Sequence, residues 1–169
     1  AGQIDEETHL EGLTIEVSAA AASPSNYGVR LNGGLAQLFV RFNTINPPGM
    51  ERACAQHLAA ILEGAGFQVA VHEFAEGRTS LVATIGGEDA RPPLCFTGHM
   101  DVVPLGAARW TREAFAGETD GDRLYGRGST DMKSGIAAFV EAAVALAPRL
   151  ARGPGLVLVI TAGEEIGCE

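Results

Sequence analysis

The stretch PPLCFTGHMDVVP, residues 92–104, is where the character of the sequence changes. Its first half contains the apolar run LCF, which predicts a short buried strand, and the Thr-Gly pair that follows ends this strand. His99 and Asp101 come next, two positions apart. An imidazole and a carboxylate at the end of a hydrophobic strand call for an explanation other than packing.

The composition is that of a globular domain. The chain has 169 residues, of which 46% are hydrophobic and 20% charged, and this is enough for one domain with its own core. The formal charge of −9, from 21 acidic and 12 basic residues, argues against a nucleic acid or an anionic membrane as partner, because phosphates require a concentrated positive patch. No apolar run reaches the roughly eighteen residues of a membrane span, so no membrane association is expected.

The cysteines and the amino-terminal residues favour a cytoplasmic protein. The three cysteines, Cys54, Cys95 and Cys168, are odd in number and form no CxxC pair, which is typical of reduced thiols that serve packing. The start, AGQIDEETHL, lacks the charged and then apolar layout of a signal peptide.

Hydrophobic periodicity predicts alternating helices and strands from residue 35 onward. Helical spacing covers residues 35–43, 50–66 and 133–147, and strand patterns cover residues 67–74, 80–87, 92–98 and 155–162. The third strand is apolar on both faces and is therefore expected to be central in its sheet. The pattern predicts an α/β fold, a three-layer arrangement with a mixed, largely parallel sheet flanked by helices. Residues 1–34 stay an unassigned segment or linker, and residues 35–169 form the domain.

Five polar residues follow predicted strands or precede the long helix, where open α/β sheets place their sites. His99 and Asp101 follow the third strand. Asp131 directly precedes the helix at 133–147, and Glu164 and Glu165 follow the fourth strand. If these strands run parallel, the five side chains leave the sheet at one edge and are expected to converge.

Each of these residues also has a plain structural interpretation. His99 alone could be an ordinary loop histidine, Asp131 could cap the helix, and the Glu-Glu pair could be a solvated turn. The segment GRGSTDMKSG, residues 126–135, resembles a phosphate-binding loop only loosely, because it lacks the GxxxxGK[ST] spacing.

If the groups converge, they predict a hydrolytic metal site. Zinc binds imidazole nitrogen and carboxylate oxygen, and a histidine ligand commonly donates its other N–H to a carboxylate such as Asp101. Asp131 could bridge two metal ions about 3.5–4 Å apart. Of the two adjacent glutamates only one needs to bind metal, and the other could serve as general base.

Three motifs together resemble one enzyme family. They are TGHMDVVP (97–104), DGDRLYGRGSTDMKSGIAAF (120–139) and VITAGEEIGCE (159–169). In this order and spacing they are similar to the acetylornithine deacetylases, succinyl-diaminopimelate desuccinylases, aminoacylases and glutamate carboxypeptidases, a family of dinuclear zinc metallohydrolases. The resemblance covers residues 35–169, which would be the amino-terminal part of the catalytic domain.

The resemblance implies a role for each candidate. His99 would bind one metal ion, Glu165 the other, and Asp131 both. Glu164 would be the general base, and Asp101 would act in catalysis by holding the imidazole of His99. The cofactors would be two divalent ions, zinc first, with cobalt or manganese as alternatives. The family also leads us to expect a cis peptide bond between Asp131 and Met132.

The implied activity is hydrolysis of an amide bond in an N-acyl amino acid or a small peptide, of the deacylase or carboxypeptidase type. Members of the family are longer, with further ligands and a lid domain through which they often form homodimers, and these would lie beyond the present sequence. The alternative hypothesis is an α/β fragment or interaction domain that retains the motifs without catalysis.

Overall fold

The computed structural model of the chain describes residues 9–10, 13–14, 34–87, 91–107 and 109–167. Most of the unassigned segment 1–34 therefore lies outside the described residues. The exceptions are Gly34 and two short strands, β1 (His9–Leu10) and β2 (Leu13–Thr14), which pair antiparallel. Within the described residues, no helix is both long and apolar enough to cross a bilayer.

A four-stranded sheet forms the frame of the domain. In order across the sheet, its strands are β3 (Gln68–Ala75), β4 (Arg78–Ile85), β8 (Leu156–Thr161) and β5 (Leu94–His99). The pairs β3–β4 and β4–β8 are antiparallel, whereas β8 and β5 are parallel. The expected α/β fold with a mixed sheet is confirmed, but the sheet is not largely parallel as predicted, because among the described residues only the β8–β5 pair is parallel.

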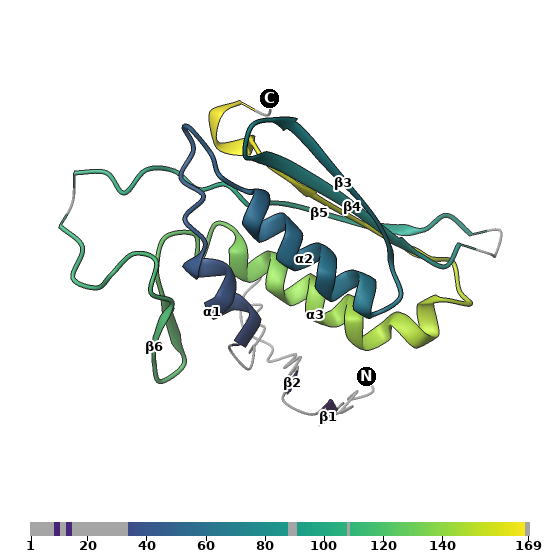
Figure 1. The fold of residues 1–169 in the computed structure, drawn as a ribbon. Helices are drawn as coiled ribbons and strands as arrows, with labels where there is room; N and C mark the ends of the chain where they lie inside the picture. The colour runs from purple at the N-terminus through teal and green to yellow at the C-terminus, as the bar shows by residue number, and fades with distance from the viewer. Residues whose placement is uncertain (1–8, 11–12, 15–33, 88–90, 108, 168–169) are drawn as a thin grey trace.

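The described residues form three α-helices on one side of this sheet; two of them pack against its face, and the other lies against one of these two (Figure 1). The three helices are α1 (Gly34–Arg41), α2 (Arg52–Gly64) and α3 (Lys133–Leu150). The helix α2 contacts β3 and β4, α3 contacts β5 and β8, and α1 lies against α3. The residues of β4 and β8 alternate between buried and less buried positions, which is the period of two expected for strands covered on one face.

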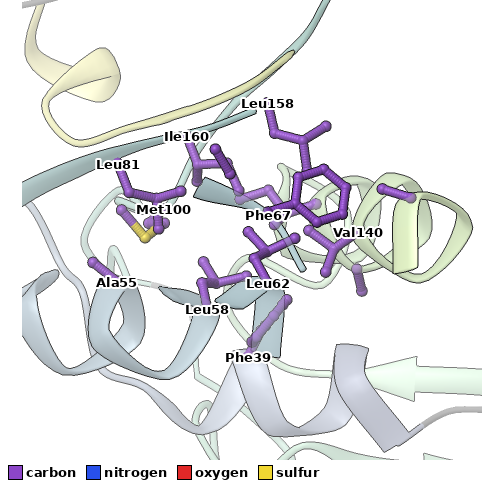
Figure 2. Close-up of a cluster of buried hydrophobic side chains, with 14 of the residues drawn as sticks. Phe39, Ala55, Leu58, Leu62, Phe67, Leu81, Met100, Val140, Leu158 and Ile160 are labelled. Atoms are coloured by element: carbon purple, nitrogen blue, oxygen red, sulfur yellow. The ribbon is translucent and has the colours of Figure 1, made fainter. Parts of the chain in front are cut away.

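The hydrophobic core fills the space between the helices and the sheet (Figure 2). The helices and the sheet contribute large, fully buried side chains, among them Phe39, Leu58, Leu62, Leu81, Val140, Leu158 and Ile160. Burial of each such side chain stabilises the fold by about 1.5–3 kcal/mol. The core therefore fixes the position of α3 on β5 and β8, the strands whose ends carry the candidate site.

The expectation that the strand at 92–98 is central is wrong within the described residues, because β5 is an edge strand. Its apolar side chains are correspondingly open, with Leu94 60% and Phe96 42% exposed, although Phe96 stacks on Phe139 of α3. Cys54 is buried, as predicted, but Cys95 of this edge strand is exposed. Cys168 lies outside the described residues.

The segment before α3 contains a hairpin where the sequence predicts only a loop. Strands β6 (Glu118–Asp120) and β7 (Arg123–Tyr125) pair antiparallel around a turn at Gly121, whose φ is 59°. The Gly-Asp dipeptide of this two-residue turn, Gly121 and Asp122, is a hairpin signal that the apolar pattern does not reveal. Arg112 lies over the ring of Tyr125, 4.1 Å from its centroid, and holds the hairpin against the preceding loop.

A buried ion pair anchors the loop between α1 and α2. The Nε of Arg78 lies 3.1 Å from Oε2 of Glu51, and both side chains are almost fully buried. A second guanidinium nitrogen, Nη1, donates to the carbonyl of Pro48 at 3.2 Å. Burial raises the pKa of Glu51, and the charge of Arg78 acts in the opposite direction.

We expect Arg78→Met to lower the free energy of unfolding by about 3–5 kcal/mol, because it leaves the Glu51 carboxyl buried without its partner. The matched control is Arg52→Met, which removes a neighbouring pair with Glu73 whose side chains are 44% and 36% exposed. That change should cost much less, since solvent already screens the pair. Urea denaturation followed by circular dichroism measures both variants, and equal losses would contradict the prediction.

Candidate metal centre

The parallel pairing of β5 and β8 brings the candidate residues to one edge of the sheet. His99, the last residue of β5, lies opposite Thr161, the last residue of β8. The chain leaves both strands on the same side, so Asp101 and the Glu164–Glu165 pair emerge next to each other. The predicted convergence of these residues is thereby confirmed.

A glycine allows α3 to begin close to this edge. A Cβ atom on Gly98 would lie 3.0 Å from Cε of Met132 and 3.2 Å from Cγ1 of Ile136. Such contacts are tighter than ordinary side-chain packing, so with a larger residue at position 98 these side chains at the start of α3 would have to shift by a few tenths of an ångström. Asp131, which directly precedes this helix, therefore comes within reach of His99.

His99 is buried and has a different partner at each ring nitrogen. Its Nδ1 lies 3.1 Å from the backbone carbonyl oxygen of Asp101 and 3.5 Å from Oδ1 of the same residue. Because the carbonyl can only accept, Nδ1 carries a hydrogen and donates it. The other nitrogen, Nε2, faces Oδ1 of Asp131 at 3.0 Å. The side chain of Asp101 raises the pKa of His99 to about 9, although burial acts against this.

The carboxylate of Asp101 is fully buried and surrounded by donors. Its Oδ2 accepts from Nδ2 of Asn46 at 2.8 Å and from the amide of Glu165 at 3.0 Å, and its Oδ1 accepts from the amide of Glu164 at 3.3 Å. Burial by itself would raise the pKa of Asp101. The hydrogen bonds from His99, Asn46 and the two amides outweigh burial and hold this pKa well below the usual range.

Asp131 faces His99 and does not cap the helix that follows it. The residue at the cap position of α3 is Met132, and no side chain makes a cap hydrogen bond there. The alternative interpretation of Asp131 as a helix cap is therefore wrong. The carboxylate of Asp131 is 73% exposed and turned toward His99, and its peptide bond to Met132 is cis, as the resemblance implied.

The two glutamates lie on a short 3₁₀ helix, η1 (Glu164–Ile166). Gly163 precedes it with a φ of 94°, a conformation that favours glycine and lets the chain turn directly after β8. Oε2 of Glu164 lies 3.7 Å from Nε2 of His99. Burial is the main cause that raises the pKa of Glu165; the charge of His99 acts to lower this pKa, and the charges of Asp131, Asp101 and Glu164 each raise it by a smaller amount.

The donor set fits a divalent metal ion. His99, Asp131 and Glu165 each offer one ligand atom, and these atoms all lie within 4.8 Å of one another. One imidazole nitrogen with carboxylate oxygens is a ligand combination that zinc accepts. Besides burial, the charges of Asp131, Asp101 and Glu164 act to raise the pKa of Glu165, so the carboxylates repel one another, and a cation between them would relieve that repulsion.

The structure adds two residues that sequence reasoning did not single out. Asn46 contacts Asp101 across 55 positions of sequence, and the pattern TINPPG marks it only as part of a helix break. Lys133 is fully buried, and its Nζ donates to the carbonyl of Phe42 at 2.6 Å, which ties the start of α3 to the end of α1. Burial lowers the pKa of Lys133 to about 8. Since its amine points into the interior, the phosphate-loop interpretation of residues 126–135 is not supported.

Comparison with known sequences places this centre in a family. The profile of Peptidase family M20/M25/M40 matches residues 95–169. A succinyl-diaminopimelate desuccinylase from Wolbachia sp. subsp. Brugia malayi is 39% identical over 137 residues, covering 78% of this chain and 33% of the relative. One from Cereibacter sphaeroides is 42% identical over 127 residues, covering 75% and 33%. The chain spans about one third of the length of the curated relatives it matches.

Solved structures agree with this placement. An M20 family metallo-carboxypeptidase from Sulfolobus solfataricus superposes with a TM-score of 0.67 at 25% identity, covering 78% of this chain and 30% of that one. Human carnosine dipeptidase 1 shares the fold, with a TM-score of 0.63 at 23% identity and coverage of 78% and 31%. Residues 95–169, which carry the motifs, match the profile of Peptidase family M20/M25/M40, and the chain shares its fold with these enzymes, so it resembles the amino-terminal part of that family's members.

Proposed function

We propose that the protein hydrolyses an amide bond in a small N-acyl amino acid or peptide, using divalent metal ions. The observation that carries the proposal is the convergence of His99, Asp131 and Glu165 at one edge of the sheet. The names of the relatives, a desuccinylase and a metallo-carboxypeptidase, support an amide next to a carboxylate as the bond that is cleaved. From the family resemblance we also infer homodimerisation through a lid domain, and the free thiols of Cys54 and Cys95 support a cytoplasmic location.

Three side chains would hold the metal. His99 would bind through Nε2, because its Nδ1 donates to Asp101. Glu165 and Asp131 would contribute carboxylate oxygens, and Asp131, with two oxygens in an exposed carboxylate, would bridge two ions. Zinc fits this set best among the candidates, and cobalt and manganese remain alternatives. When bound, such an ion supplies Lewis acidity and a water of lowered pKa.

Glu164 is suited to move the proton. Its side chain is 50% exposed and lies 3.7 Å from the ring of His99, at the rim of the ligand group. Asp101 accepts a hydrogen bond from the backbone amide of Glu164, which fixes the start of η1 without involving the carboxylate of Glu164. Glu164 would take a proton from water at the site and return it to the nitrogen of the leaving amine.

Metal content tests the proposal. We expect the purified chain to retain zinc after dialysis and Asp131→Ala to lose most of it, because one ligand of the group is removed. Glu63→Ala, which removes an exposed carboxylate on α2, is the matched control and should keep the wild-type zinc content. Elemental analysis per folded chain measures all three, and wild-type protein without zinc would overturn the proposal.

Metal affinity should rise with pH. With a pKa of about 9 in the metal-free chain, His99 carries a proton at neutral pH that the metal must displace. Binding of Co²⁺ should therefore release a proton at pH 7 and strengthen by about tenfold per pH unit up to roughly pH 8.5. Calorimetric titration in buffers of different ionisation enthalpy measures the proton release, and an affinity independent of pH would contradict this assignment.

Substitution of Glu164 should separate binding from hydrolysis. We expect Glu164→Gln to keep the wild-type zinc content and to lower the hydrolysis of N-succinyl, N-acetyl and dipeptide substrates by about 10²-fold or more. Zinc binding without hydrolysis by the wild-type chain would instead favour the alternative of a non-catalytic domain. Full activity in Glu164→Gln would place the base elsewhere.

A further inference from the structure

Asn46 is a buried polar residue next to the site, and none of the roles proposed above involves it. It lies in the loop between α1 and α2 and is 1% exposed. Its Nδ2 donates to Oδ2 of Asp101 at 2.8 Å, one of the shortest contacts of that carboxylate. The same Oδ2 accepts the amide of Glu165 at 3.0 Å. A single oxygen therefore connects Asn46 with the backbone of a proposed metal ligand.

The loop is attached to the site strand by its backbone. The amide of Asn46 donates to the carbonyl of Val102 at 2.9 Å, and the amide of Val102 donates to the carbonyl of Thr44 at 3.0 Å. The hydroxyl of Thr44 donates to the carbonyl of Met100 at 2.6 Å. Residues 44–46 thus run beside residues 100–102 like an added strand.

The far end of the loop is held as well. The carbonyl of Pro48 accepts from Arg78, whose ion pair with Glu51 is buried. Asn46 therefore has little freedom to move away from Asp101, and the loop presents its amide at a fixed place. This is the arrangement expected for a group that orients another side chain.

The hydrogen bonds of the Asn46 side chain indicate that it acts as a donor and not as an acceptor. Its Oδ1 is buried and accepts no hydrogen bond from the described residues. An unpaired buried acceptor costs about 1–3 kcal/mol, so packing alone is a poor reason for an asparagine here. The donor, in contrast, is used on Asp101. An uncharged donor steadies that carboxylate without neutralising the charge that faces His99.

We propose that Asn46 is a positioning residue of the metal centre, because its amide fixes the rotation of the Asp101 carboxylate that holds His99 on one side and the Glu164–Glu165 backbone on the other. Asn46 thereby sets the spacing of two metal ligands, His99 and Glu165, without touching the metal. This inference rests on the proposed function, since it concerns the same metal centre. It also assigns the loop at 44–49 a part in the site.

Two variants and a control test the role. Asn46→Ala removes the donor, and Asn46→Ser removes the contact while keeping a small polar side chain if the alanine variant does not fold. Thr44→Val is the matched control, because it deletes a buried hydrogen bond from the same loop to Met100 without touching Asp101. The readouts are Co²⁺ affinity, the visible spectrum of bound Co²⁺, and hydrogen exchange of the Glu164 and Glu165 amides.

We expect both Asn46 variants to bind Co²⁺ about tenfold more weakly, as for other groups that support metal ligands indirectly. Their Co²⁺ spectrum should change, and the Glu164 and Glu165 amides should exchange faster than in wild type. Thr44→Val should lower thermal stability and leave these readouts unchanged.

The outcomes separate this inference from the proposed function. Wild-type protein that binds no Co²⁺ would overturn the metal centre itself. Wild-type protein that binds Co²⁺, with Asn46 variants of unchanged affinity, spectrum and exchange, would overturn only the role of Asn46. Equal effects of the Asn46 variants and Thr44→Val would show that the loop acts through stability alone and would also overturn the inference.

Discussion

The site depends on the buried carboxylate of Asp101. A carboxylate without solvent contact is stable as an anion only if donors surround it, and here the imidazole of His99, the amide of Asn46 and two backbone amides supply them. These donors come from the end of β5, the loop between α1 and α2, and the turn after β8. The Asp101 carboxylate therefore connects three segments that are far apart in sequence and fixes their positions relative to one another.

The parallel pairing of β5 and β8 in the sheet brings these segments together. Because β5 and β8 run parallel, their carboxyl ends lie together, and the polar residues that follow them share one edge. The core between α2, α3 and the sheet fixes this pair of strands, and Gly98 lets the start of α3 bring Asp131 alongside. Packing of apolar side chains thus gathers acidic groups that would otherwise repel one another, which is the condition under which a divalent cation is bound.

Much of the fold and of the candidate site could be predicted from the sequence. Periodicity identified the three helices and the four strands of the main sheet, and the positions of His99, Asp131 and the Glu-Glu pair after strands or before a helix indicated a common edge. The hairpin of β6 and β7 was not predicted, because its sequence signal is a turn dipeptide and not a hydrophobic periodicity. The edge position of β5 was not predicted, because an apolar run indicates that the faces of a strand are covered and does not indicate how many strands pair with it.

The sequence by itself determined which residue types stand at the ends of the strands and which elements carry them, since local periodicity and motif spacing are properties of the chain. Only the tertiary structure decided that Asp131 faces His99 and does not cap its helix, that Lys133 points inward, and that Asn46 reaches Asp101. These choices depend on hydrogen bonds between segments 32, 91 and 55 residues apart. Such pairings follow from how the packed elements bring donors and acceptors together in space, and no local pattern encodes them.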